Sequence, residues 1–196
     1  IRVTKAADRK TRSYTQQVMA RPREFDVDAV LDRATDLFWA RGYEATSVQD
    51  LVDTLGVNRA SLYATFGDKA QLFEAVLRAR DEADMTRFGT ADPIDNLTAI
   101  VRHNRSVPGL VQLYSTFSAE AGDPDHSSHE YFVERYAGIR EALADAVRAR
   151  QSAGTFNPSA DPDAIATLLI ALSDGLQIQT QYELSTDPGD FFDHLL

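Results

Sequence analysis

The fold is decided by residues 46–69, which read TSVQDLVDTLGVNRASLYATFGDK. A first helix is predicted there because apolar residues recur at the helical spacing, which places them on one buried face: Val48, Leu51, Val52 and Leu55. Thr46 is expected to cap this helix, with Gln49 three residues on reaching back to the amide of the cap. Gly56 follows, where a residue that tolerates positive φ can end the helix and turn the chain.

A second short helix is expected directly after this turn. Asn58 is a favourable cap, and Val57 before it can pack on Leu62, inside the helix, as a hydrophobic staple. Two helices joined by so short a turn cross steeply, as they do in a DNA-binding helix-turn-helix. The pattern therefore predicts a DNA-binding unit whose second helix enters the major groove.

The wider sequence resembles the N-terminal domain of the tetracycline-repressor (TetR) family. An amphipathic segment that ends in ARGY at residues 40–43 precedes the run GVNRASLYATFGDKAQLF at residues 56–73. The likeness covers roughly residues 26–77. It is carried by an L-Y-x-x-F core and a lysine three residues beyond it, formed by Leu62, Tyr63, Phe66 and Lys69.

This resemblance and the residue types together indicate which side chains contact DNA. Arg59, near the start of the second helix, is placed for a bidentate contact with guanine, and the small Ala60 beside it can touch a thymine methyl group. Thr65 stands where the family very often has a phosphate-binding His, so it can donate a hydrogen bond but carries no charge. The expected DNA-binding residues are Thr46, Asn58, Arg59, Ala60, Ser61, Tyr63, Thr65 and Lys69.

The composition is that of a globular protein. Hydrophobic residues make up 43% of the chain and charged residues 26%, both ordinary values for such proteins. The chain has no cysteine, which excludes disulfides and thiolate metal sites. No apolar run approaches the ~20 residues of a membrane-spanning helix, and the beginning of the chain lacks the apolar segment of a signal peptide. We therefore expect a cytoplasmic protein with no membrane partner.

The net charge of −10 is unevenly distributed along the chain. Residues 1–69 carry 11 Lys and Arg against 10 Asp and Glu, whereas residues 70–196 carry 9 against 20. A near-neutral head on an acidic body is expected if only the head meets phosphate.

The chain is expected to have four parts: a basic tail over residues 1–24, a helix-turn-helix domain over residues 25–70, a connecting helix over residues 71–89 and a helical effector-binding and dimerisation body over residues 90–196. The tail is typical either of a disordered segment or of an arm that follows phosphates. The run MARPREFD from Met19 resembles the start of many family members, so residues before it are either an upstream extension or foreign to the natural protein.

Caps and turns predict where the helices begin. Asp26 is expected to cap the first helix, and Asp68, with Gln71 three residues on, to cap a connecting helix that reaches about Phe88. At ~1.5 Å per residue that helix is ~30 Å long, which makes it the natural lever between head and body. In the body, helices are expected to begin at Asp92 or Pro93, Pro108, His129, and Asp161 or Asp163, with a last one over residues 187–196.

The predicted fold is all-α: a three-helix helix-turn-helix DNA-binding domain followed by a helical ligand-binding and dimerisation domain. The helix that starts near Asp161 is unusually apolar over residues 165–172. Either it is the centre of the body, or it also faces a second copy, as the four-helix dimer bundle of the resembled family implies.

That resemblance also implies an effector cavity in the body. Candidate ligand-binding residues are polar or aromatic residues on otherwise apolar helices: His103, Tyr114, Thr116, Phe117, Asp174 and Gln177. The alternative for each is a hydrogen-bonded core residue. Asp174 is the most suggestive, because a carboxylate on an apolar helix needs a partner.

The sequence gives little support for metal binding or catalysis. Glu120, Asp123, His126 and His129 form a small group of possible metal ligands, but turn residues around them favour a structural loop. There is no cysteine nucleophile, no G-x-S-x-G elbow and no glycine-rich phosphate loop after a strand. We expect no cofactor, no resident metal and no enzymatic activity.

The predicted function is a homodimeric, TetR-like transcriptional regulator, a repressor that a small-molecule effector releases from inverted-repeat, double-stranded DNA. The alternative is a helical protein that binds small molecules and has lost DNA binding, and a purely structural interaction protein comes third. Salt dependence separates the first two, because a DNA-binding dimer releases counterions from each contacted phosphate.

Overall fold

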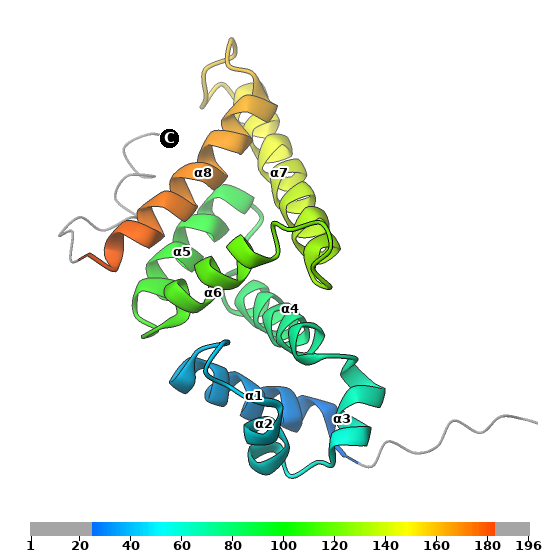
Figure 1. Ribbon diagram of the computed structural model, residues 1–196. Helices are drawn as coiled ribbons and strands as arrows, with labels where there is room; N and C mark the ends of the chain where they lie inside the picture. The colour runs from blue at the N-terminus through cyan, green and yellow to red at the C-terminus, as the bar shows by residue number, and fades with distance from the viewer. Residues whose placement is uncertain (1–24, 183–196) are drawn as a thin grey trace, which may run out of the picture.

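The computed structural model describes residues 25–182, and over that range the chain forms eight helices and no strand (Figure 1). This confirms the predicted all-α fold. The basic tail and the helix expected over residues 187–196 lie outside the described residues. The helices are α1 (Val27–Arg41), α2 (Val48–Leu55), α3 (Arg59–Phe66), α4 (Lys69–Phe88), α5 (Pro93–Arg105), α6 (Leu110–Glu120), α7 (His129–Ser152) and α8 (Pro162–Thr180).

Most helix ends are where the sequence predicts them. Asp26 caps α1, Asn58 caps α3, and Asp68 caps α4 with Gln71 completing the capping box. Gly56 has φ 69°, a left-handed conformation that ends α2 and sends the chain into α3. The helix-turn-helix is therefore fixed by local chemistry at each of its boundaries.

The cap of α2 is Ser47, so the prediction of Thr46 is wrong. The Ser47 hydroxyl accepts from the Asp50 amide at 3.1 Å, and the Asp50 carboxylate accepts from the Ser47 amide at 3.0 Å. Asp50 completes this box because it lies three residues after the Ser47 cap, whereas the predicted Gln49 lies only two residues after it. The Asp50 carboxylate also pairs with Arg41 of α1 at 2.7 Å. Thr46 is instead fully buried, and its hydroxyl donates to the Gly42 carbonyl at 2.7 Å.

The body consists of α5–α8, with α7 and α8 forming a long helical hairpin (Figure 1). Here one predicted boundary is wrong, because α6 starts at Leu110 and not at Pro108. The chain makes a turn before it, with Gly109 at φ 75° in the N-cap position. A left-handed residue cannot continue an α-helix, so α6 begins after it.

The head and the body share a hydrophobic core. Phe73 of α4 lies at its centre, with ring centroids 4.9 Å from Phe38 and 4.6 Å from Phe117. Phe117 belongs to α6 and also packs on Tyr43, at 4.7 Å, in the loop after α1. A second core, made by α5, α7 and α8, lies further from the head. A displacement of α4 or α6 would therefore change the packing of α1–α3 in this shared core.

Candidate functional sites

The outer face of α3 is exposed, while its inner face is anchored. Arg59 and Ala60 are exposed at its first turn, and Tyr63 is 41% exposed one turn later. Leu62, at 4% exposure, fixes the helix to the core. Tyr63 is thus a surface residue and not a core aromatic. The arrangement presents a guanidinium, a methyl group and a phenol on one side of a short, rigid helix.

The residues expected to contact phosphate behave differently from one another. Lys69 donates to the Tyr43 carbonyl at 3.1 Å and lies 4.0 Å from the centre of its ring. Thr46 donates to the same carbonyl through its amide, at 3.2 Å, and its hydroxyl is also used internally. Thr65 is half-buried. Lys69, with three donors, keeps capacity for a phosphate, whereas both donors of Thr46 are engaged in the loop after α1.

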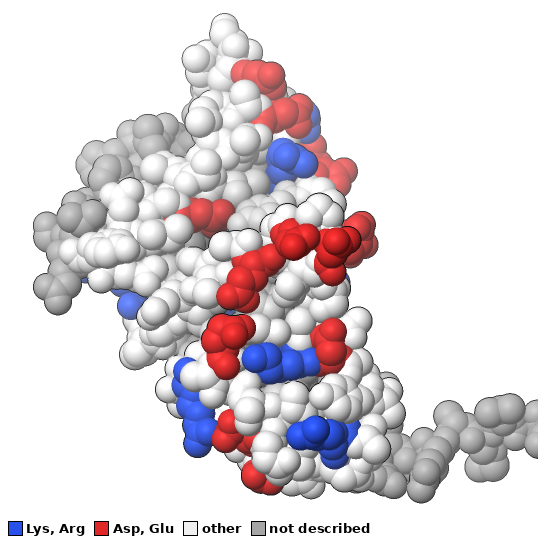
Figure 2. Space-filling view, in the orientation of Figure 1, with Lys and Arg blue, Asp and Glu red and all other residues white. Residues whose placement is uncertain are grey.

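Charge is segregated on the visible face of the molecule. Figure 2 shows Asp and Glu predominating over the body, while most of the Lys and Arg on this face lie over the lower part formed with α1–α3. A polyanion is therefore repelled by the body and tolerated at the head.

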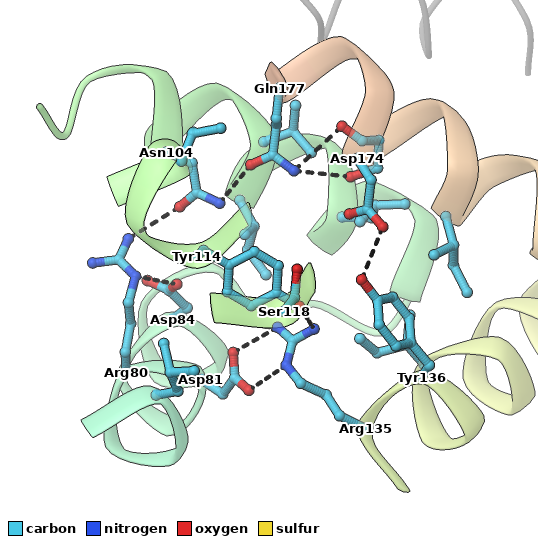
Figure 3. Close-up of a pocket in the computed structure, with 18 of the residues that line it drawn as sticks. Arg80, Asp81, Asp84, Asn104, Tyr114, Ser118, Arg135, Tyr136, Asp174 and Gln177 are labelled. Carbon is cyan, nitrogen blue, oxygen red and sulfur yellow. Dashed lines mark hydrogen bonds and ion pairs between the residues drawn. The ribbon is translucent and has the colours of Figure 1, made fainter. Parts of the chain in front are cut away.

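A cavity of about 500 Å³ lies inside the body, walled by α4, α5, α6, α7 and α8. Its volume suits a drug-sized ligand. Most of the wall is apolar, and its main polar side chains form three groups, most of whose residues are labelled in Figure 3.

The first group joins α4 to α7. Arg135 grips both carboxylate oxygens of Asp81, with Nε–Oδ2 and Nη2–Oδ1 distances of 2.8 Å each, and donates to the Tyr114 hydroxyl at 3.0 Å (Figure 3). The Tyr131 hydroxyl also donates to Asp81, at 3.3 Å. These carboxylate contacts raise the pKa of Arg135 against the opposing effect of its burial. We call this Arg135–Asp81 pair the clamp, because its two parallel hydrogen bonds join α7 to α4, the helix that leads to the head.

The second group links α4, α5 and α8. Arg80 pairs with Asp84 at 3.4 Å and donates to the Asn104 amide oxygen at 3.0 Å. The Asn104 amide donates to the Gln177 side-chain oxygen at 2.8 Å, and the Gln177 amide donates to the Ser173 hydroxyl at 3.2 Å. Burial raises the pKa of Asp84, in spite of the nearby Arg80.

The third group is Asp174 with Tyr136. The Tyr136 hydroxyl donates to the Asp174 carboxylate at 3.1 Å. Burial raises the pKa of Asp174, and the hydrogen bond from Tyr136 and the charge of Arg135 only partly offset it. Within residues 25–182 no Lys, Arg or His forms an ion pair with Asp174.

Three of the six predicted ligand residues, Tyr114, Asp174 and Gln177, line this cavity. His103, Thr116 and Phe117 do not. His103 packs on Phe88, at 5.1 Å, and burial together with nearby arginines lowers its pKa. Thr116 is exposed on the outer side of α6, and Phe117 is buried in the core shared with the head.

Six polar residues of the cavity wall were not predicted: Arg80, Asp81, Asp84, Asn104, Arg135 and Tyr136. A signal for it exists on α4. The inward stripe that contains Phe73 and Leu77 continues at helical spacing to Arg80 and Asp84. Polar residues in the register of a buried stripe indicate either an exposed end or an internal polar site, and periodicity alone does not separate the two.

The group considered for metal binding is used structurally. The His126 ring accepts from the Ser128 amide at 3.2 Å and packs on Phe117. His129 contacts the Ala121 carbonyl at 2.8 Å. Over the described range, no cluster of three or more His, Cys, Asp or Glu is arranged to hold a metal ion.

Two family models match the chain. One, described as bacterial regulatory proteins, tetR family, matches residues 30–76, and the other, described as BetI-type transcriptional repressor, C-terminal, matches residues 94–190. Among curated proteins, the HTH-type transcriptional repressor ComR of Escherichia coli is 31% identical over 176 residues, which is 82% of this chain and 82% of that protein. None of the helices in residues 25–182 has both the length and the hydropathy needed to cross a bilayer.

Solved structures share the fold. A cysteine mutant of the TetR family regulator CifR, complexed with a 26-bp operator DNA, superimposes with a TM-score of 0.60 at 24% identity over 88% of this chain and 94% of that one. A transcriptional regulator from Saccharomonospora viridis in complex with choline gives a TM-score of 0.64 at 24% identity, over 85% and 90%. At such identities the likeness concerns the fold alone.

Proposed function

The chain belongs to the TetR family of bacterial transcriptional regulators, and we propose that it is a repressor which an effector in the body cavity releases from an inverted-repeat operator. As a DNA-binding regulator it acts where the chromosome is, in the cytoplasm. The proposal has three parts: how the head reads DNA, how two copies pair, and how the cavity controls the head.

The head reads DNA through α3. Arg59 and Ala60 lie at its exposed first turn, where a recognition helix meets base edges, and Arg59 supplies the bidentate donors that guanine accepts. Tyr63, one turn farther along α3, and Lys69, the first residue of α4, contact phosphates, which fixes the register of the helix. We replace Thr46 in this set with Ser47, because Ser47 is exposed at the N-terminus of α2 whereas Thr46 is buried.

Two copies pair through the outer face of α8. Leu168 is 63% exposed and Ile178 is 41% exposed on this helix, and small residues lie between and before them in the same stripe, at Ala164, Ala171 and Gly175. An apolar stripe of this length on the surface marks an interface. TetR regulators are homodimers, and a twofold dimer places two copies of α3 in successive major grooves, roughly 34–36 Å apart.

The observation that carries the regulatory part is the double role of α6. Tyr114 and Ser118 on one side of α6 line the cavity, while Phe117 on the other side packs against Phe73 and Tyr43 of the shared core. The cavity wall also includes Arg80 and Asp81 of α4, the helix that starts directly after α3. A ligand that shifts either helix would therefore disturb the core in which Leu62 anchors α3. Such coupling between ligand and DNA is typically worth ~1–3 kcal/mol.

The test compares two variants on duplexes that carry inverted repeats from upstream of the protein's own gene. Arg59→Ala is expected to cost ~1–3 kcal/mol of operator binding and to relax specificity at one base pair of each half-site. Lys69→Ala is expected to weaken binding to all sequences alike, and to lower the salt dependence. Fluorescence anisotropy at several salt concentrations measures both. Unchanged affinity and specificity for Arg59→Ala would remove this residue from base readout.

A further inference from the structure

We propose that the effector is an amphiphilic organic cation, whose ammonium group is received by Asp174 and the Tyr136 hydroxyl while its apolar body fills the remaining cavity. This rests on the proposed function only in that the cavity is taken as the effector site.

The wall carries more negative than positive charge. Its charged residues are two arginines, Arg80 and Arg135, and three carboxylates, Asp81, Asp84 and Asp174. Arg135 is paired with Asp81 and Arg80 with Asp84. Asp174 is the third carboxylate. It accepts a hydrogen bond from the Tyr136 hydroxyl and forms no ion pair inside residues 25–182. A half-buried carboxylate without a counter-ion costs free energy, and a bound cation lowers that cost.

An anionic effector fits this wall poorly. Arg135 already uses its fork on both oxygens of Asp81 and its remaining nitrogen on Tyr114. An anion would have to displace Asp81, which would leave that carboxylate without its partner. At the Asp174 end, burial and neighbouring acidic groups raise the pKa of Tyr136, so further negative charge is disfavoured there as well.

The rest of the wall selects a ligand with a sizeable apolar body. The helices that carry Tyr136 and Asp174 also give the cavity wall apolar side chains, Ile139 and Leu143 from α7 and Ile170 from α8. A compact ammonium ion would occupy only a small part of about 500 Å³ and would leave these side chains without contacts. In Figure 3, Asp174 and Tyr136 lie on the opposite side of the view from Arg80 and Asp84. The ammonium group is therefore assigned to the Asp174 side of the cavity.

The test uses four probes that separate charge from apolar length: octyltrimethylammonium, octane-1-sulfonate, 1-octanol and tetramethylammonium. Calorimetric titration of the full chain, below the concentration at which micelles form, measures each affinity. We expect octyltrimethylammonium to bind at least about tenfold more tightly than any of the other three, since both the charge and the chain contribute. Equal or tighter binding of octane-1-sulfonate would overturn the proposal.

Two variants locate the cation. Asp174→Asn keeps the size of the side chain and an acceptor for Tyr136 but removes the charge, and it is expected to weaken octyltrimethylammonium about tenfold or more without changing 1-octanol by more than about twofold. Tyr136→Phe removes the hydroxyl that orients Asp174 and is expected to have a smaller effect in the same direction. Asp125→Asn, in an exposed loop outside the cavity, removes the same formal charge and is the matched control, with no expected effect.

Circular dichroism confirms that each variant is folded. If Asp174→Asn binds the cation as tightly as the unchanged protein does, the assignment to Asp174 is wrong. Operator binding by the unchanged protein without any probe is measured in parallel. Operator binding without cation binding would overturn the effector class and leave the regulator, whereas cation binding without any operator binding would leave the cavity assignment and overturn the regulator.

Discussion

The head and the cavity use their polar side chains in opposite ways. On α3, Arg59 and Tyr63 project from a helix whose position is fixed by caps and by Leu62, so the surface is ready for a rigid partner. In the cavity, Arg135 of α7 and Asp81 of α4 form an ion pair with each other. A ligand therefore either leaves this pair intact or breaks it on binding. The first arrangement favours recognition of a fixed shape, and the second favours a response to binding.

The largest expected effect tests whether the two regions form one cooperative unit. Phe73→Ala empties a fully buried position at the centre of the shared core and is expected to cost ~3–5 kcal/mol of unfolding free energy. Urea titration followed by the fluorescence of Trp39, the single tryptophan, and by circular dichroism measures it. The fluorescence and circular dichroism transitions should have the same urea midpoint, both in the unchanged protein and in the variant. A head transition that separates from the body in the unchanged protein would contradict the shared core.

The next effect concerns the clamp between α4 and α7. Arg135→Ala leaves Asp81 without its bidentate partner and removes the bond to Tyr114, and we expect a loss of about 2–3 kcal/mol, below the range for fully buried pairs because Asp81 is 42% exposed. Arg148→Ala, which breaks exposed pairs with Asp145 and Asp163, is the control and should change stability little. Thermal unfolding of both variants measures the difference. Equal, small effects would show that the clamp contributes nothing beyond a surface pair.

A smaller effect separates the two adjacent hydroxyls before α2. Ser47→Ala removes the cap and is expected to cost ~1 kcal/mol of stability. Thr46→Val removes a buried hydrogen bond to Gly42, also at a cost of about 1 kcal/mol, but leaves operator affinity unchanged once the protein is folded. Fluorescence anisotropy titrations measure the operator affinity of both variants at a temperature where both are folded. A drop in affinity specific to Thr46→Val would restore Thr46 to the DNA-contacting set.

The smallest effect depends on pH. Because the pKa of Asp174 is raised in the folded protein, the unfolded chain loses this proton first as pH rises, and the folded carboxylate lowers stability at neutral pH. Asp174→Asn should therefore raise Tm at pH 7 in the absence of ligand. The gain should shrink as pH falls towards the ordinary aspartate pKa of ~3.9. The titratable and charged groups near this carboxylate are Tyr136, Tyr114 and Arg135. They are the same in the Asp174→Asn variant and in the unchanged protein, so the difference in Tm reports on Asp174. A gain that stays constant with pH would exclude ionisation as its cause.

The same contrast between the regions explains what could be predicted from sequence. The caps at Asp26, Asn58 and Asp68 and the left-handed Gly56 depend on neighbours within a few residues, so local patterns are sufficient. Local sequence does not distinguish Thr46 from Ser47, because both are hydroxyl residues next to the same helix. What separates them is the place of each hydroxyl in the fold: that of Thr46 is buried and donates to the Gly42 carbonyl after α1, while that of Ser47 accepts from the Asp50 amide.

The cavity needed information that local patterns do not contain. The Arg135–Asp81 pair joins residues 54 positions apart, and Asn104 meets Gln177 across 73 positions. Tyr114 and Phe117 look alike in sequence, as aromatic residues on one apolar helix. Their opposite roles follow only from the placement of α6 between the cavity and the head.

The central claim is that two copies of α3 read an inverted repeat, and competition titration of the full chain tests it most directly. A labelled inverted-repeat operator with half-site centres about 10 base pairs apart competes with a scrambled duplex of equal length at physiological salt. We expect one dimer per duplex and a preference for the operator of about 10³-fold or more. Binding by a monomer, or equal affinity for both duplexes, would contradict it.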